Sequence, residues 1–369
     1  MSEESTVVES DFSKLSRLWQ LPILLALAEC LTHFGSLQGD SSGYIDMVKL
    51  FRGVATPQEA QVYAWHGMLR PIVPFLSIPV SYVVDYPLAI ATVSTAFILV
   101  GTFAVYMTSE KLFGAKTAFI AAISFASAIP VLTQGAAVLS DGAGYGMLAV
   151  LTYMGLFMFP QKQTYAFSLV TGIMIALGVL TKETNLLVLI LIWIYFFANK
   201  GKLRGSSVLI VTVVALGIAL TWAQAVGQSY LGFYGQGLMY HNAAPSYAGP
   251  LLHPRQFLLT LEYAFGIGLA FAILGFFSVD DDNFKLLLEL LIATAAVVLL
   301  WPTPPEDRLT FLLFPAIIPL AAFGITKASN NLSTRPVFRK LSDEAWLTLF
   351  SLLVVLLNNL SGLRVIRLP

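Results

Sequence analysis

The sequence predicts an all-α, polytopic membrane protein with about eleven transmembrane helices. Three observations carry this prediction: 57% of the 369 residues are hydrophobic, only 11% are charged, and the mean hydropathy is +0.77. Soluble domains carry roughly 25% charged residues, so the composition excludes a soluble protein. Lys+Arg and Asp+Glu balance at 21 each, which leaves no basic excess for nucleic-acid binding. The single cysteine, Cys30, can form no internal disulfide.

Apolar segments of membrane-spanning length recur along the whole chain. A helix rises about 1.5 Å per residue, so roughly 20 residues cross a hydrocarbon core of about 30 Å. The fifth and sixth segments are short enough to dip into the bilayer instead of crossing it. The predicted spans are 18–38, 86–107, 117–134, 142–159, 165–181, 184–198, 206–227, 257–277, 285–301, 308–326 and 345–362.

The loops predict the orientation of the chain. Basic residues are retained on the cytoplasmic side during insertion, and the short basic loops 199–205 and 327–340 read as inner loops. The amino end is then a cytoplasmic tail, 1–17, and 18–369 form a single transmembrane domain. The tail has no basic n-region or cleavage site, so we expect the first span to be retained as an anchor.

Two predicted outer loops are long, whereas the inner connections are brief. Loops longer than about 15 residues are uncommon unless they carry function. The second long loop, 228–256, is aromatic, and the first, 39–85, begins with a segment suited to short amphipathic helices at the membrane interface. Within 65–80, three prolines suggest a broken, half-inserted segment. The working surface is therefore expected on the extracytoplasmic face. The apolar face of the interfacial helix comprises Tyr44, Met47, Val48, Leu50 and Phe51.

Four ionisable residues far apart in the sequence fall on this outer side, beside predicted spans: Asp40, Asp141, Lys182 and Arg308. Each of these four residues also has a purely structural interpretation. Either acid would also serve as a helix N-cap, Lys182 would be solvated in a turn beside Glu183, and Arg308 would snorkel to the headgroups. Alternatively, the Arg308 guanidinium offers a fork that matches a phosphate. Together these acids and bases predict a site for an anionic lipid headgroup and a reacting acceptor.

Further residues are expected to line a substrate cavity at that site, in part because ionisable groups at membrane depth are functional candidates by default. A divalent cation, Mg²⁺ or Mn²⁺, would need several oxygen ligands. Asp40, Asp141 and Glu306 offer some, but their separation gives no readable ligand spacing. The metal requirement therefore stays open. The expected cavity residues are Tyr44, Glu29, Glu183, Glu306, Asp307, Tyr240 and His241.

Five motifs, taken in order, resemble the GT-C superfamily of integral-membrane glycosyltransferases, in its protein mannosyltransferase and aminoarabinose transferase-like branch. They extend from the first outer loop to the tenth span, and their order is as informative as their letters. Three glycines follow Asp141 in the third motif, which permits close helix approach. The motifs are GDSSGYIDMVKLFRG (39–53), RPIVPFL (70–76), SDGAGYGMLAVLTY (140–153), LTKETNLLVL (180–189) and DRLTFLLFPAIIPLAAF (307–323).

The resemblance implies a transferase that takes a sugar from a polyprenyl-phosphate donor at the extracytoplasmic face. Asp40 would match the general base that acts on the acceptor, which would be a lipid, a glycan or a protein. Lys182 and Arg308 are the donor-phosphate candidates, with Arg70 behind them. Such chemistry needs a base for the acceptor proton and cations for the departing phosphate. Many family members carry Asp-Glu where this chain has Asp40-Ser41, so the acceptor class stays open.

The alternative class is a membrane transporter or lipid flippase, which would also expose basic groups to lipid phosphate. A transporter needs access from both faces and ionisable groups near mid-membrane. Here such groups lie at the outer mouths of spans, and Glu29 is almost alone within one. A structural or assembly subunit is a third class, but it would not explain why acids and bases converge on one face.

Overall fold

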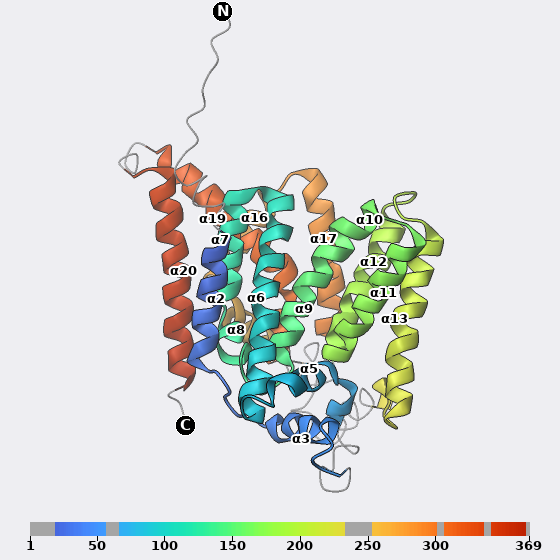
Figure 1. Cartoon of the computed structure of the whole chain (residues 1–369). Coiled ribbons are helices and arrows are strands. Elements are labelled where there is room, and N and C mark those ends of the chain that lie inside the picture. The colour runs from blue at the N-terminus through green and yellow to red at the C-terminus, as the bar shows by residue number, and fades with distance from the viewer. Residues whose placement is uncertain (1–18, 57–65, 233–252, 301–305, 336–340, 367–369) are drawn as a thin grey trace, which may run out of the picture.

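The computed structural model describes residues 19–56, 66–232, 253–300, 306–335 and 341–366, and in these ranges every regular element is a helix (Figure 1). The predicted all-α class is confirmed. The helices of the bundle, in chain order, are α2 (Gln20–Thr32), α6 (Tyr86–Phe113), α7 (Ala115–Ala126), α8 (Ile129–Gln134), α9 (Asp141–Tyr153), which η3 (Met154–Met158) and α10 (Phe159–Gln161) continue, α11 (Tyr165–Thr181), η4 (Glu183–Leu186) with α12 (Leu187–Ala198), α13 (Gly205–Ala225), α15 (Pro254–Phe265), α16 (Gly268–Phe276), α17 (Asp281–Leu299), α18 (Asp307–Thr310), η6 (Phe311–Leu313), α19 (Phe314–Ser333) and α20 (Asp343–Ile366).

Each of the eleven predicted spans coincides with a helix or a run of helices, but their lengths differ. Within the described residues, five helical stretches are long and apolar enough to cross a membrane: α6, α9–α10, α13, α18–α19 and the first 18 residues of α20. The α15–α16 pair adds a sixth if it counts as one span, although it bends by 97°. The other segments are shorter or more charged, so the number of about eleven crossings stays a prediction, as does the division into tail and membrane domain.

Glycines bring α6 and α9 into close contact. A Cβ at Gly101 would lie 2.5 Å from the Cα of Gly146, and one at Gly146 would collide with the Phe97 carbonyl oxygen. Gly142 abuts the Gly135 backbone, and Gly144 abuts the side chain of Lys182. The expectation that the three glycines after Asp141 permit close packing is confirmed, because no larger residue fits these approaches without a shift.

The described residues of the first predicted outer loop lie across one end of the bundle, at the bottom of Figure 1. Its helix α3 (Ser41–Phe51) buries Tyr44, Met47 and Val48, in agreement with the predicted apolar face. After the short 3-10 helix η2 (His66–Leu69), α5 (Ile72–Val80) is a continuous helix with Pro79 inside it. The prolines therefore do not break this helix.

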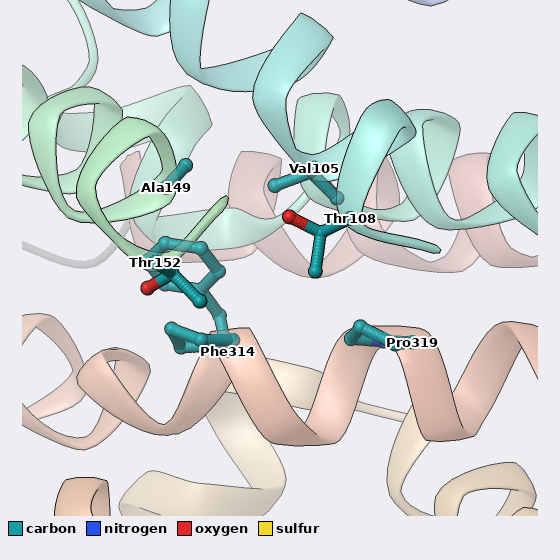
Figure 2. Close-up of a pocket in the computed structure, with 7 residues that line it drawn as sticks. Val105, Thr108, Ala149, Thr152, Phe314 and Pro319 are labelled. Carbon is teal, nitrogen blue, oxygen red and sulfur yellow. The ribbon is translucent and has the colours of Figure 1, made fainter. Parts of the chain in front are cut away.

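A small void of about 10 Å³ lies between α6, α9 and α19 (Figure 2). This is room for about one water molecule. None of the residues that line it is a candidate site residue, so the void marks imperfect packing beside Pro315 and Pro319. Its lining comprises Val105, Thr108, Ala149, Thr152, Phe314, Pro315 and Pro319.

Candidate active site

Two buried ion pairs form the centre of the candidate site. The Lys182 ammonium binds the Asp141 carboxylate. Beside it, the Arg70 guanidinium donates two hydrogen bonds of 2.6 Å to Glu183, one to each carboxylate oxygen. The four side chains are between 3% and 11% exposed. Burial of charge is costly unless the charges are paired with good geometry, and both pairs meet that condition.

The local sequence explains how Lys182 reaches Asp141. Lys182 ends α11 in extended backbone, and Asp141 is the first residue of α9. The Lys182 side chain lies over Gly144, where a Cβ would be 3.0 Å from both its Cβ and its Cδ. The helix N-cap is Ser140, so the Asp141 carboxylate serves the ion pair instead of the cap.

The Tyr44 hydroxyl joins helix α3 to this centre. It shares a 2.6 Å hydrogen bond with the Ser140 hydroxyl and accepts a 3.3 Å bond from Arg70 Nη1. Burial raises the pKa of Tyr44, so the phenol stays protonated.

The two buried cations are shifted in opposite directions. Although burial opposes it, the Glu183 carboxylate raises the pKa of Arg70 above its ordinary value. Burial lowers the pKa of Lys182, and the Asp141 carboxylate opposes that shift.

Arg308 approaches the same centre from α18. Its backbone carbonyl accepts a 2.9 Å hydrogen bond from the Tyr145 hydroxyl on α9, and its charge acts on Asp141. Its Nε atom binds Glu306, and its side chain is 39% exposed. Within the described residues, neither of its terminal nitrogens has a recorded partner. Arg308 is therefore the cation of the cluster most accessible to a ligand.

Asp40 lies at the N-cap position of α3, half-buried and without a side-chain capping bond. Its segment runs along the bundle, since Val138 N donates to Ser36 O at 3.0 Å and the Gln38 amide donates to Thr133 O at 3.3 Å. The Asp40 carbonyl accepts from Tyr44 N at 3.4 Å, so the acid lies one helical turn from Tyr44. No hydrogen bond or ion pair of its carboxylate is recorded among the described residues.

Of the other expected site residues, Glu306 and Asp307 lie beside Arg308, whereas Glu29 lies elsewhere. Glu29 on α2 is buried and accepts a 2.8 Å hydrogen bond from Asn359 on α20, away from the two ion pairs. Glu306 is exposed and binds Arg308, and Asp307 is half-buried beside it. Tyr240 and His241 lie outside the described residues.

The described residues contain no group of three or more His, Cys, Asp or Glu able to hold a metal ion. The Asp141 carboxylate is already bound to Lys182, which makes it a poor oxygen donor for a cation. The requirement for Mg²⁺ or Mn²⁺ therefore stays open, and no step below passes through a metal.

An apolar groove of about 380 Å³ opens near the ion pairs, between α11 and α13. Leu180, two residues before Lys182, lies on one side of it. On the other side is Trp222, whose indole donates a 2.8 Å hydrogen bond to the Met68 carbonyl, two residues before Arg70. Leu180 and Trp222 thus connect the groove to the segments that carry Lys182 and Arg70.

Some residues of the site escaped the sequence analysis. Ser140 precedes Asp141 and Tyr145 follows it within the third motif. The motif itself was therefore the signal that could have identified both residues. Outside the site, Asn359 on α20 binds Glu29, and a polar residue within an otherwise apolar helix was the signal for that buried contact.

A family model of the dolichyl-phosphate-mannose-protein mannosyltransferases matches residues 71–223. No match was found among proteins of curated function.

Several solved structures share the fold. ArnT from Cupriavidus metallidurans in the apo state has a TM-score of 0.63 at 12% identity, over 95% of this chain and 77% of that one. The same protein bound to undecaprenyl phosphate has a TM-score of 0.61 at 13% identity, over 95% and 70%. The Archaeoglobus fulgidus oligosaccharyltransferase AglB, in complex with an inhibitory peptide and a dolichol-phosphate, has a TM-score of 0.61 at 14% identity, over 96% and 55%.

The five motifs of the sequence lie on α3, α5, α9, the α11–η4 turn and α18–α19, and the third and fourth fall wholly within the matched range 71–223. The family match over residues 71–223 and the shared fold support the resemblance to the GT-C superfamily.

Proposed function

We propose that this chain is a glycosyltransferase of the GT-C type that takes a sugar from a polyprenyl-phosphate-linked donor and transfers it to an acceptor at the extracytoplasmic membrane face, with Asp40 as general base. The observation that carries the proposal is the meeting of Asp141, Lys182 and the accessible Arg308 at one end of the helical bundle, beside an apolar groove. An anionic headgroup on a long apolar chain is the chemistry that suits this combination.

Arg308 holds the donor phosphate in this proposal. Its two terminal nitrogens present a planar fork, which matches two phosphate oxygens. Lys182 is the second phosphate candidate, and its ion pair with Asp141 holds it at the site. Arg70 stands behind them, because its guanidinium is already occupied by Glu183 and Tyr44.

The prenyl chain lies in the groove between α11 and α13. Leu180 and Ile218 offer apolar contact there, and the remaining lining is small or aromatic. The solved neighbours support a lipid donor, since ArnT has been crystallised with undecaprenyl phosphate and AglB with a dolichol-phosphate. AglB was also solved with a peptide, whereas the acceptor of this chain is proposed only as a lipid, a glycan or a protein.

Asp40 suits the base better than Asp141 does. A general base needs a carboxylate free to accept a proton, and the Asp141 carboxylate is held by Lys182. In the proposed step, the acceptor oxygen or nitrogen attacks the anomeric carbon. The bond from that carbon to the phosphate oxygen breaks, the electron pair leaves with the polyprenyl phosphate, and the acceptor proton passes to Asp40.

The test is incubation of the purified protein with labelled polyprenyl-phosphate sugars and a panel of lipid, glycan and peptide acceptors. The proposal expects labelled acceptor together with released polyprenyl phosphate. Movement of intact lipid across vesicles without cleavage would instead support the flippase alternative, and the absence of transfer from every polyprenyl donor would refute the proposed donor class.

The proposed face has its own test, which uses cysteine labelling on a Cys30→Ala background. With the amino end in the cytoplasm, a cysteine at position 56 should react with an impermeant maleimide in intact cells. Lys200→Cys, in the basic loop after α12, is the matched inner control and should react only after permeabilisation. The reverse pattern would overturn the orientation.

A further inference from the structure

Two side chains about one turn apart on α9 hold the residues that are proposed to bind the donor phosphate. Asp141, the first residue of α9, binds Lys182. Tyr145 lies four residues later, and its hydroxyl group donates a hydrogen bond of 2.9 Å to the backbone carbonyl of Arg308. Residues four apart lie on the same face of a helix, about 6 Å apart along its axis. Lys182 and Arg308, far apart in the sequence, are therefore attached to neighbouring positions of one helix.

Tyr145 contacts the segment of Arg308 at two points. Its side chain is 0% exposed, so water does not compete for the bond to the Arg308 carbonyl. Its ring packs edge-on against Phe311, the first residue of η6, with ring centroids 5.0 Å apart and an interplanar angle of 82°. Phe311 is also fully buried. The contact between α9 and the start of the α18–α19 stretch is thus both polar and apolar.

Helix α18 depends on such contacts because it is a single turn of four residues. Most of the stability of a short helix comes from tertiary packing instead of its own backbone hydrogen bonds. The Thr310 hydroxyl shares a 2.9 Å hydrogen bond with the Thr260 hydroxyl, which ties α18 to α15. The bond from Tyr145 ties α18 to α9, the helix that carries Asp141.

The position of the Arg308 backbone matters for binding. The charge of Arg308 acts on Asp141, so the guanidinium lies near the Lys182–Asp141 pair. Hydrogen bonds between charged groups are short, about 2.7–2.9 Å, so two cations share one phosphate only when their separation is fixed. The Arg308 side chain is long and 39% exposed. A fixed backbone limits the side-chain entropy that it loses when a ligand binds.

We propose that Tyr145 is a positioning residue for the donor phosphate: its hydroxyl group fixes the Arg308 backbone relative to Asp141, so that Arg308 and Lys182 reach the same phosphate. The inference rests on the proposed function, in which these two cations bind that phosphate. It adds that α9 sets the separation of the cations. Because Tyr145 is fully buried, it acts through Arg308 and not on the ligand.

The test measures binding of a non-hydrolysable polyprenyl-phosphate analogue to Tyr145→Phe. This variant keeps the ring and its contact with Phe311, so it should fold, and thermal unfolding in detergent checks that it does. Loss of one neutral hydrogen bond should raise the Kd of the analogue about 3- to 10-fold, with KM for the acceptor unchanged. Tyr153→Phe, at a half-buried tyrosine at the end of the same helix, is the matched control and should keep the Kd of the parent.

A second background separates positioning from general support of the fold. Arg308→Met has no guanidinium to position, so adding Tyr145→Phe to it should change the Kd by less than about 2-fold. Residues that act through one another show such non-additive effects. A purely structural role of Tyr145 predicts the same 3- to 10-fold rise in both backgrounds.

Two outcomes would overturn the inference. An unchanged Kd in Tyr145→Phe, beside weakened binding by Arg308→Met, would show that Arg308 is positioned without Tyr145. An equal rise of the Kd in both backgrounds would show that Tyr145 only supports the fold. Failure of the proposed function gives a different result, because the parent protein would then not bind the analogue, or Arg308→Met would bind it as tightly as the parent does.

Discussion

The ion pairs at the two ends of the helical bundle differ in how deeply they are buried. At the candidate site, Lys182–Asp141 and Arg70–Glu183 are buried, and Arg308 stands beside them. Near the start of α20, Lys116 and Asp343 are paired at 3.4 Å with side chains 35% and 28% exposed. An exposed pair adds little stability and costs little, whereas buried charges are costly to maintain. The difference supports the proposed function, in which the buried pairs lie at the site of the chemistry, whereas the exposed pair joins α7 to α20.

The largest expected effect comes from breaking a buried pair. Arg70→Met would leave Glu183 buried without a cation, which should lower the free energy of unfolding by about 3–5 kcal/mol. Lys116→Met, in the exposed pair, is the matched control and should cost at most about 1 kcal/mol. Thermal or denaturant-induced unfolding of the protein in detergent measures both losses of stability. Equal losses in the two variants would remove the distinction between the two ends.

The next prediction contrasts a free acid with a paired one. Asp40→Asn keeps size but cannot accept a proton, so turnover should fall by roughly 10²-fold or more while stability and donor binding persist. Asp141→Asn should instead lower stability, because Lys182 loses its partner. Asp46→Asn, in a surface pair with Lys49, is the control. Near-normal turnover of Asp40→Asn beside an inactive but stable Asp141→Asn would reverse these roles.

A smaller effect is expected at the accessible cation. Arg308→Lys keeps the charge and loses the fork, so binding of a non-hydrolysable polyprenyl-phosphate analogue should weaken by about 1.5–3 kcal/mol. Arg204→Lys, at an exposed arginine before α13, should bind the analogue like the parent. If Arg308→Lys also binds it as tightly, Arg308 is a snorkelling anchor.

The smallest effect concerns the packing that holds Lys182. Gly144→Ala puts a methyl group against the Lys182 side chain and should cost about 1 kcal/mol, the low end for overpacking, because a lysine can shift. Gly217→Ala meets nothing within 4 Å and should stabilise its helix by about 0.5–1 kcal/mol. Thermal unfolding compares the two. A stabilising Gly144→Ala would contradict the described contact.

The sequence predicted the positions of the helices better than it predicted which side chains pair with one another. Hydropathy and loop composition located α3, the apolar segments and the three glycines after Asp141, because these are local patterns. The partner of Arg70 was not predictable, since Glu183 lies 113 residues away and both looked like loop or turn residues. The contact between Glu29 and Asn359 spans 330 residues. The 97° bend at Gly266 was also missed, because glycine is common in membrane helices.

The contact between Gly144 and Lys182 has a consequence for related sequences. The lysine stem occupies the space that a side chain at position 144 would need, so the ion pair depends on three positions instead of two. Relatives that keep both charges should keep glycine three residues after the acid. Relatives that replace the lysine with a smaller residue are free to carry alanine or serine there. Covariation of these positions would identify the paired arrangement in sequences too divergent to align along their whole length.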